Sequence, residues 1–219
     1  MRTPINLLFL CCCAFLFDTT LSSQSANLPI DVDPNTLSRL PLVQRGSLDA
    51  NGQRIYDFMN QGSPTPRLGP INSTLHSPVV GEPFEMLNRN LRQSIVGSHY
   101  FELCTLLAAW EYKQQYEWTA HEIAALKAGV DQKTIDAIKF NRGIDALPEK
   151  DATVIRFGRA LLRQHKVDSK LYAQIIQLFG RQGMIDLTLT LGDYVMTALV
   201  LNAVDQQLQP DRKPLLPGR

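Results

Sequence analysis

Apolar residues recur at spacings of three and four along most of the chain, which is the pattern of helices with one buried face. Ser47, Asp131 and Asp168 stand where N-terminal helix caps are expected. No strand-like alternation stands out, and neither does an internal repeat of about 20 to 50 residues. We therefore predict an all-α bundle of about seven or eight helices, with approximate ranges 48–60, 82–93, 99–113, 116–128, 131–140, 149–165, 168–179 and 184–208.

Two of these predicted helices, 99–113 and 184–208, are apolar around most of their surface. Such helices are buried in a core or between subunits. The second is not predicted to span a membrane, because charged residues are costly inside a bilayer. We expect it at the centre of a homo-oligomer, such as a trimer or hexamer. The polar residues that interrupt it are Asp186, Asp193, Asn202 and Asp205.

The first 26 residues have the pattern of a secretory signal peptide. The basic residue Arg2 precedes an apolar run, Leu7–Phe17, and the small polar segment TTLSSQSA follows. This run is shorter than the roughly 20 apolar residues that a spanning helix needs. Export to a secreted or periplasmic location is the prediction, with no stable membrane insertion once the signal is removed. A retained membrane anchor is the alternative.

The remaining chain divides into three parts by composition. Residues 27–70, rich in Pro, Asp and Ser at the start, are predicted to form an arm and one short helix. Residues 71–208 form the predicted helical domain, and residues 209–219 are predicted to be a loose C-terminal tail. The sequon Asn72-Ser73-Thr74 has meaning only in a eukaryotic source.

Charge and cysteine content narrow the possible functions. With 22 Lys and Arg against 21 Asp and Glu, no basic excess is present to bind phosphates, so no nucleic-acid partner is expected. Cys11, Cys12 and Cys13 lie within the predicted signal, which leaves Cys104 alone in the mature chain. One cysteine cannot form an internal disulfide, a dithiol redox pair or a thiolate metal site. Cys104 is expected to be a small buried residue.

The candidate chemistry lies in the stretch 102–121. Glu117 and His121 are four residues apart, so they share one face of a helix, and Glu102 lies on an otherwise apolar helix. A buried carboxylate needs a partner, which His121 would provide, and the group would then be suited to proton transfer. A solvated pair on the surface is the alternative. A metal site is not expected, because no second His has suitable spacing.

The run from Glu102 to Val130 resembles the carboxymuconolactone decarboxylase and alkyl hydroperoxidase D (AhpD) superfamily. In the peroxidase branch, a Cys-x-x-Cys-x-x-x-His motif begins twelve residues after a helix-borne Glu. Here Gln114 and Glu117 occupy the cysteine positions, while Glu102 and His121 match. The segment YEWTAHEIAALKAGV is similar to the cysteine-less branch, and a weaker resemblance extends over 71–203.

This resemblance implies an AhpD-like helical fold and acid/base chemistry on a small organic acid or lactone, with no metal or organic cofactor. The reaction would be a decarboxylation, an isomerisation or a lactone hydrolysis. His121 would be the acid/base, Glu117 would orient and charge it, and Glu102 would share the proton or bind a substrate hydroxyl. Two alternatives stay open: a peroxidase that depends on Cys104 alone, and a non-enzymatic oligomeric binding module.

Three further residues are candidates for substrate binding. Tyr116 and Trp118 flank Glu117, although such aromatic residues more often belong to a core or an interface. His76 lies in a predicted loop that could reach a pocket of its own or of a neighbouring subunit, although a lone loop histidine is usually exposed. His99, near a predicted helix start, is expected to be structural.

Asp193 lies in the apolar final helix and therefore needs a partner inside the fold. An arginine such as Arg92 or Arg156 would serve.

Overall fold

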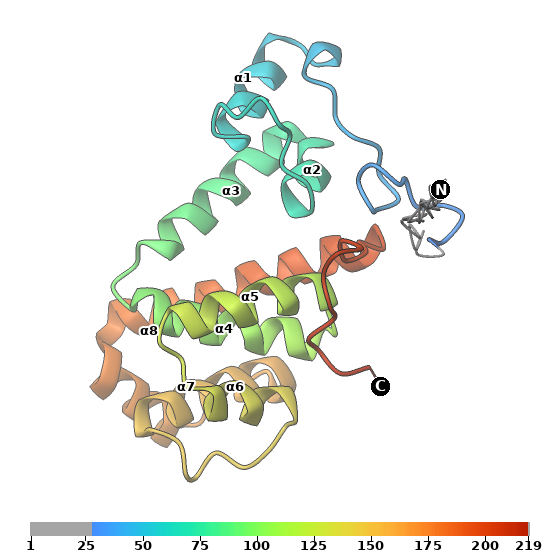
Figure 1. Cartoon of the computed structure of the whole chain (residues 1–219). Coiled ribbons are helices and arrows are strands. Elements are labelled where there is room, and N and C mark those ends of the chain that lie inside the picture. Colours follow the sequence, from blue (N-terminus) through green and yellow to red (C-terminus); the bar gives the residue numbers. More distant parts are fainter. Residues whose placement is uncertain (1–27, 219) are drawn as a thin grey trace, which may run out of the picture.

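The computed structural model describes residues 28–218, which form eight α-helices and contain no β-strand (Figure 1). The predicted all-α class is therefore confirmed. The predicted signal peptide lies outside the described residues. The helices are α1 (Ala50–Met59), α2 (Pro70–Leu75), α3 (Pro78–Arg92), α4 (Gly97–Glu111), α5 (Gln115–Lys127), α6 (Gln132–Lys139), α7 (Glu149–Arg159) and α8 (Ser169–Ala203).

The helices differ from the predicted ranges mainly around three prolines. Pro70 and Pro78 occupy the first turns of α2 and α3, where a missing N–H removes no helical hydrogen bond. The sequence pattern treats this segment as a loop and places the start of α3 near residue 82. Pro83 in fact lies inside α3. The sequence pattern thus misses α2 and the true start of α3, because a proline can mark either a chain break or the first turn of a helix.

α4 is the centre of the fold and packs against α5, α7 and α8. Its residues Leu103, Cys104 and Leu106 have no exposed surface, and Trp118 of α5 is equally buried beside them. Figure 1 shows α4, α5 and α8 running side by side, with α6 and α7 packed on one side of them. The burial of Cys104 agrees with its expected structural role.

The two C-terminal helices that the sequence predicts form one element, α8, in the structure. Gly180 has a φ of 69°, which breaks the helical geometry at the predicted turn. By length and composition α8 could cross a membrane, and 44% of its most apolar window is buried inside the protein. Its buried side includes Leu187, Leu191 and Leu201.

The helices α1, α2 and α3 enclose a second, smaller core that includes Ile55, Met59 and Leu75. They form the upper part of the molecule in Figure 1. The preceding arm is anchored to this part through Asn72, which is buried and accepts a hydrogen bond from Val43 N at 3.0 Å. Asn72 is thus a structural amide inside the protein.

The arm and the C-terminal tail pack more firmly than the sequence suggests. In the arm, Leu37 O accepts hydrogen bonds from Gln207 N and from the Gln206 side chain, just beyond α8. The predicted loose tail instead buries Leu216 in the main core, and Leu215 N donates to Thr119 Oγ1 at 3.3 Å. Two apolar residues in the tail are enough to fix it against α5.

A close contact joins the N-terminal helices to α5. Gly69, which precedes α2, has a φ of 65°, and a Cβ there would lie 2.6 Å from Tyr116 Oη. Gly62 has a similar φ of 66°, but nothing lies within 4 Å of its Cβ position.

We predict that Gly62→Ala costs about 1 kcal/mol for the left-handed backbone alone. Gly69→Ala should cost a further ~1–3 kcal/mol, because the new methyl group overlaps the Tyr116 ring. Chemical denaturation of both variants measures the difference. Equal losses of stability would contradict the close contact between Gly69 and Tyr116.

Candidate active site

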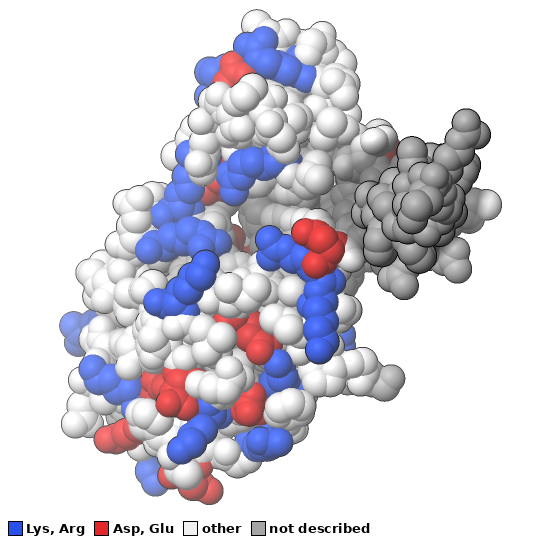
Figure 2. All heavy atoms as spheres, in the orientation of Figure 1, with Lys and Arg blue, Asp and Glu red and all other residues white. Residues whose placement is uncertain are grey.

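A cavity of about 460 Å³ lies between the N-terminal helices and the body of the protein. α2 and α3 form one side of it, α5 and α8 form the other, and the C-terminal tail closes one end. Figure 2 shows Lys and Arg side chains on both sides of the hollow at this junction. The lining residues are Arg67, Leu68, Pro70, Ile71, Phe84, Glu85, Asn88, Arg92, Tyr116, Glu117, Ala120, His121, Tyr194, Thr197 and Gln209.

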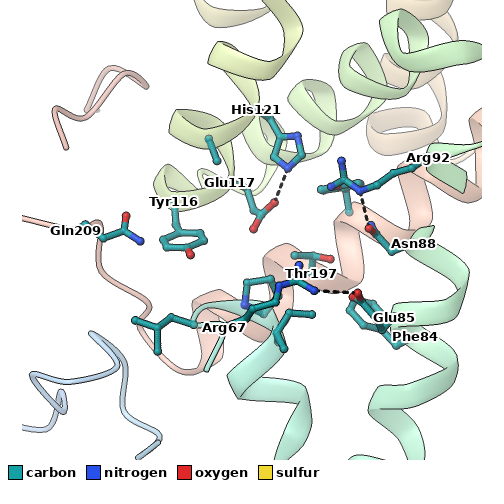
Figure 3. A pocket seen from close by; sticks show the side chains of 15 residues that line it. Arg67, Phe84, Glu85, Asn88, Arg92, Tyr116, Glu117, His121, Thr197 and Gln209 are labelled. Carbon is teal, nitrogen blue, oxygen red and sulfur yellow. Dashed lines mark hydrogen bonds and ion pairs between the residues drawn. The ribbon is translucent and has the colours of Figure 1, made fainter. Parts of the chain in front are cut away.

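The structure brings Glu102, Glu117 and His121 together in one chain of contacts. α4 packs against α5, which places Glu102 Oε2 2.6 Å from His121 Nδ1. Glu117 Oε2 lies 3.3 Å from His121 Nε2, one helical turn away on α5. All three residues are buried, and Glu117 and His121 line the cavity (Figure 3). The surface alternative for this pair is thereby excluded.

The two carboxylates control the charge of His121. Burial by itself lowers the pKa of the imidazole, but hydrogen bonds to Glu102 and Glu117 and their negative charges raise it to about 9. His121 is therefore an imidazolium at neutral pH, donating one N–H to each carboxylate. The Tyr194 ring lies edge-on to the imidazole, with 4.9 Å between the ring centroids. The imidazole is thus fixed from three directions.

Arg92 on α3 is the second charged group of the site, and its position is equally fixed. Its Nε donates to Asn88 Oδ1 at 2.9 Å, and its Nη2 donates to Tyr194 Oη at 2.6 Å. The guanidinium carbon lies 4.7 Å from the centroid of the Phe101 ring. Within residues 28–218 the structure shows no ion pair between Arg92 and a carboxylate. Arg92 therefore presents a positive charge to the cavity without an ion pair of its own among the described residues.

Arg67, which precedes α2 and also lines the cavity, differs from Arg92 because it forms an ion pair. Its Nη1 lies 3.2 Å from Glu85 Oε1 and donates to Met59 O at 3.0 Å. Arg89 also donates to Glu85, at 2.9 Å. Glu85 offsets part of the charge of both arginines, so Arg92 is the stronger site for an incoming anion.

Asp193 is hydrogen-bonded to Asn88, and the charge of Arg92, one of the two arginines expected as its partner, also acts on it. Its Oδ2 accepts a hydrogen bond from Asn88 Nδ2 at 2.7 Å, and its Oδ1 has no partner within the described residues. Burial raises the pKa of this carboxyl to about 6. The bond orients the Asn88 amide, so that Asn88 Oδ1 faces Arg92. Asp193 therefore acts on the cavity through Asn88.

The remaining candidates lie in different places. Tyr116 lines the cavity, and burial followed by the charge of Glu117 raises the pKa of its hydroxyl. Trp118 lies in the core, where its Nε1 donates to Glu122 Oε2. His76 is exposed, and its Nε2 lies 3.0 Å from Pro41 O, outside this cavity.

His99 is held by a carboxylate of its own. Its Nε2 lies 3.0 Å from Asp151 Oδ1, and Thr134 Oγ1 donates to the other oxygen of Asp151. Trp118, His76 and His99 therefore all lie outside the lining of the cavity.

Sequence reasoning missed several residues of the cavity wall. Asn88, Thr197 and Tyr194 carry no motif, and Arg92 was considered only as a partner for Asp193. The one available signal was the polar side of α3, where Asn88 and Arg92 are four residues apart. Within the described part of the chain, no group of three His, Cys, Asp or Glu side chains has a geometry that would hold a metal ion.

No protein-family model matches the sequence, and no curated protein matches it. The structure is similar to that of the apo debrominase Bmp8, with a TM-score of 0.59, 13% identity, and coverage of 80% of this chain and 92% of that chain. A cysteine-to-alanine variant of Bmp8 in complex with 2,3,4-tribromopyrrole gives a TM-score of 0.58 at 13% identity, covering 77% and 90% of the two chains. At 13% identity, this likeness shows the helical fold alone.

Proposed function

We propose that this protein is an acid/base enzyme that acts on a small organic acid or lactone, and that decarboxylation is its reaction. One observation carries the proposal: a buried carboxylate–imidazolium–carboxylate chain ends in the same cavity as an unpaired arginine. Such a pairing places a mobile proton opposite a site for negative charge. No metal or organic cofactor takes part in the proposed reaction.

Glu117 is the proposed proton donor to the substrate, which differs from the role that the sequence suggests. It lies between His121 and the open cavity, whereas both N–H groups of His121 are already committed to carboxylates. His121 supplies a proton to Glu117 through Nε2. Glu102 holds the positive charge of His121 from the other side.

The reaction proceeds with one bond broken and one formed. The bond between the substrate carbon and its carboxylate breaks, carbon dioxide leaves, and the electron pair enters a conjugated enolate. The Nε2 proton of His121 passes to Glu117, and Glu117 delivers that proton to the enolate carbon, which leaves Glu117 as a carboxylate and His121 neutral. Arg92 faces the oxygen atom on which the negative charge develops and stabilises it. Solvent then restores the proton on His121.

Bmp8, which has a similar fold, is a debrominase, and this supports the proposal that the present chain also acts on a small molecule. A thiol-dependent peroxidase is not proposed, because Cys104 is completely buried. Burial also raises the pKa of its thiol, which keeps the nucleophilic thiolate from forming.

We predict that His121→Gln lowers kcat by at least about 100-fold, because the proton source of the site is removed. His99→Gln is the matched control, since His99 is also bound to a buried carboxylate but lies outside the cavity. Loss of carbon dioxide from small carboxylated lactones, followed by mass spectrometry, measures the rate. An unchanged rate in His121→Gln, with the variant folded, would sink the proposal.

The pH dependence gives a second prediction. The rate of the natural protein should fall as pH rises through about 9, because His121 then loses the proton that it supplies. Glu102→Gln removes a hydrogen bond and a negative charge that raise the pKa of His121, so the fall should begin at a lower pH. Rates measured between about pH 6 and 10 test this. A shift toward higher pH would contradict the assigned role of Glu102.

The third prediction concerns the positive charge of Arg92. Arg92→Gln should lower kcat/KM by about 10- to 100-fold, the range expected for a lost hydrogen bond to a charged group. Arg89→Gln is the control, because Arg89 pairs with Glu85 and does not line the cavity. Equal effects of the two substitutions would show that only the overall charge matters, and the role of Arg92 would be rejected.

A further inference from the structure

Asp193 on α8 is a buried carboxylate that the proposed reaction does not use. It has no exposed surface and does not line the cavity itself. Its Oδ2 accepts the hydrogen bond from Asn88 Nδ2 at 2.7 Å, while its Oδ1 has no partner within residues 28–218. A buried carboxylate with an unsatisfied oxygen is costly in its charged form. The charge of Asp193 therefore depends on a compensating group nearby.

A single amide joins this carboxylate to Arg92. The Nδ2 of Asn88 donates to Asp193, and the Oδ1 of the same amide accepts from Arg92 Nε at 2.9 Å (Figure 3). An amide turned by about 180° would direct its acceptor at the carboxylate and its donor at the guanidinium, so both bonds would be lost. The buried negative charge and the positive charge of the cavity are thus held at the two ends of one side chain.

Charged groups on two neighbouring helices act on the Asp193 carboxyl. Burial is the main cause that raises its pKa to about 6, and the charges of Glu117 on α5 and Glu85 on α3 also raise it. The hydrogen bond from Asn88 and the positive charge of Arg92 lower the pKa. Asp193 is therefore ionised at neutral pH with the support of Arg92, and it lies close to the pH at which it takes up a proton.

The other helices packed against α8 do not replace Arg92 in this role. α2 has no ionisable side chain, and α7 meets α8 at Leu191 through Gly158. On α4, Glu102 is hydrogen-bonded to His121. Arg92 is thus the positive group that offsets the charge of Asp193.

An anion bound at Arg92 would withdraw this support. The Nε and Nη2 of Arg92 each donate one hydrogen bond inside the fold, to Asn88 and Tyr194. A guanidinium has five N–H groups, and its outer edge can hold a carboxylate through two parallel bonds. A carboxylate placed there neutralises Arg92 and brings a further negative charge toward Asp193. The pKa of Asp193 then rises further, because a nearby anion disfavours a charged carboxylate.

We propose that Asp193 takes up a proton from solvent when the cavity binds its anionic ligand, so that a carboxylate and a proton enter the site together. The proton goes to Oδ1, which accepts no hydrogen bond and so loses none, while Oδ2 keeps its bond to Asn88. The amide therefore stays in place, and Arg92 stays oriented. This inference rests on the anion site of the proposed function and adds proton-coupled binding to it. It does not require the decarboxylation step.

The coupling sets the pH dependence of binding. Below about pH 6 Asp193 is already neutral, so binding is strongest and requires no further proton. As pH rises between the pKa of the free protein and the higher pKa of the complex, each binding event must take up a proton, and the affinity falls. Above both pKa values Asp193 remains ionised in the complex, and the affinity is constant again.

Isothermal titration calorimetry of the full chain with benzoate, a small carboxylate, tests the coupling. The dissociation constant should rise by about 10-fold between about pH 6 and 8, the change that one unit of pKa shift produces. Near pH 7, titrations in two buffers of different ionisation enthalpy should show net proton uptake. Benzamide, which has the same shape without the charge, should show neither effect. A constant affinity for benzoate, or a net release of protons, would overturn the proposal.

Asp193→Asn identifies the group that takes up the proton. The new side chain can still accept from Asn88 through its oxygen, but it cannot titrate. Benzoate binding should become independent of pH, without proton uptake, and should be about 10-fold tighter than that of the natural protein at about pH 8. A merely structural role predicts weaker binding at every pH, and that result would overturn the proposal.

Asp186→Asn is the matched control. Asp186 also lies on α8 and has a buried oxygen without a partner among the described residues, but it does not line the cavity. This variant should keep the natural pH dependence and proton uptake, and loss of either would overturn the proposal. Infrared difference spectra of the natural protein provide a measurement that needs no variant. Benzoate binding near pH 7 should add a band of a protonated carboxyl group, and its absence would overturn the proposal.

Arg92→Gln separates this inference from the proposed function. Benzoate binding that depends on Arg92 but takes up no proton would overturn the inference and leave the anion site intact. Binding with proton uptake, in a protein that releases no carbon dioxide from carboxylated lactones, would support the inference and reject the proposed reaction. Equal binding by Arg92→Gln and the natural protein, or no binding of benzoate, would overturn both.

Discussion

The hydrogen bond between Glu102 and His121 is the interaction on which the site depends. It joins the two central helices, α4 and α5, at a point where both side chains are largely buried. Breaking such a pair by removing one partner leaves an uncompensated buried charge, which costs roughly 3–5 kcal/mol. The pair persists because Glu117 supplies a second carboxylate to the same imidazolium. With two carboxylates to one imidazolium, the cluster is negative overall, and the positive charge of Arg92 across the cavity offsets that excess.

The cavity itself arises from packing between two parts of the chain. α1, α2 and α3 have their own small core, and they meet the body along α8, at α4 near Phe101 and around Tyr116. The hollow between the parts is where α3 directs Asn88 and Arg92 toward α5. The tail closes one end with Gln209, after Leu216 fixes it in the core. Proton transfer and anion binding thus come from different parts of one chain.

α8 serves three surfaces at once, which explains why it is apolar nearly all round. One side is core, with Leu187 and Leu191 against the body, and another directs Tyr194 and Thr197 into the cavity. The third is an exposed face that includes Ile185, Leu189, Met196 and Leu199. Asp193 lies at the boundary between core and cavity, where it orients Asn88 at the cost of one unpaired oxygen.

The sequence by itself determined the all-α class, the approximate helix ranges and the pairing of Glu117 with His121, because these follow from spacing within a helix. It also identified Glu102, since a carboxylate on an apolar helix requires a partner. The positions of Arg92, Asn88 and Thr197 were decided only by tertiary structure. They lie on helices far apart in the chain, and no local spacing relates them to His121. The packed tail was missed because long-range burial of Leu216 outweighed local turn signals. The helical start at Pro78 was missed because a proline fits both a chain break and the first turn of a helix.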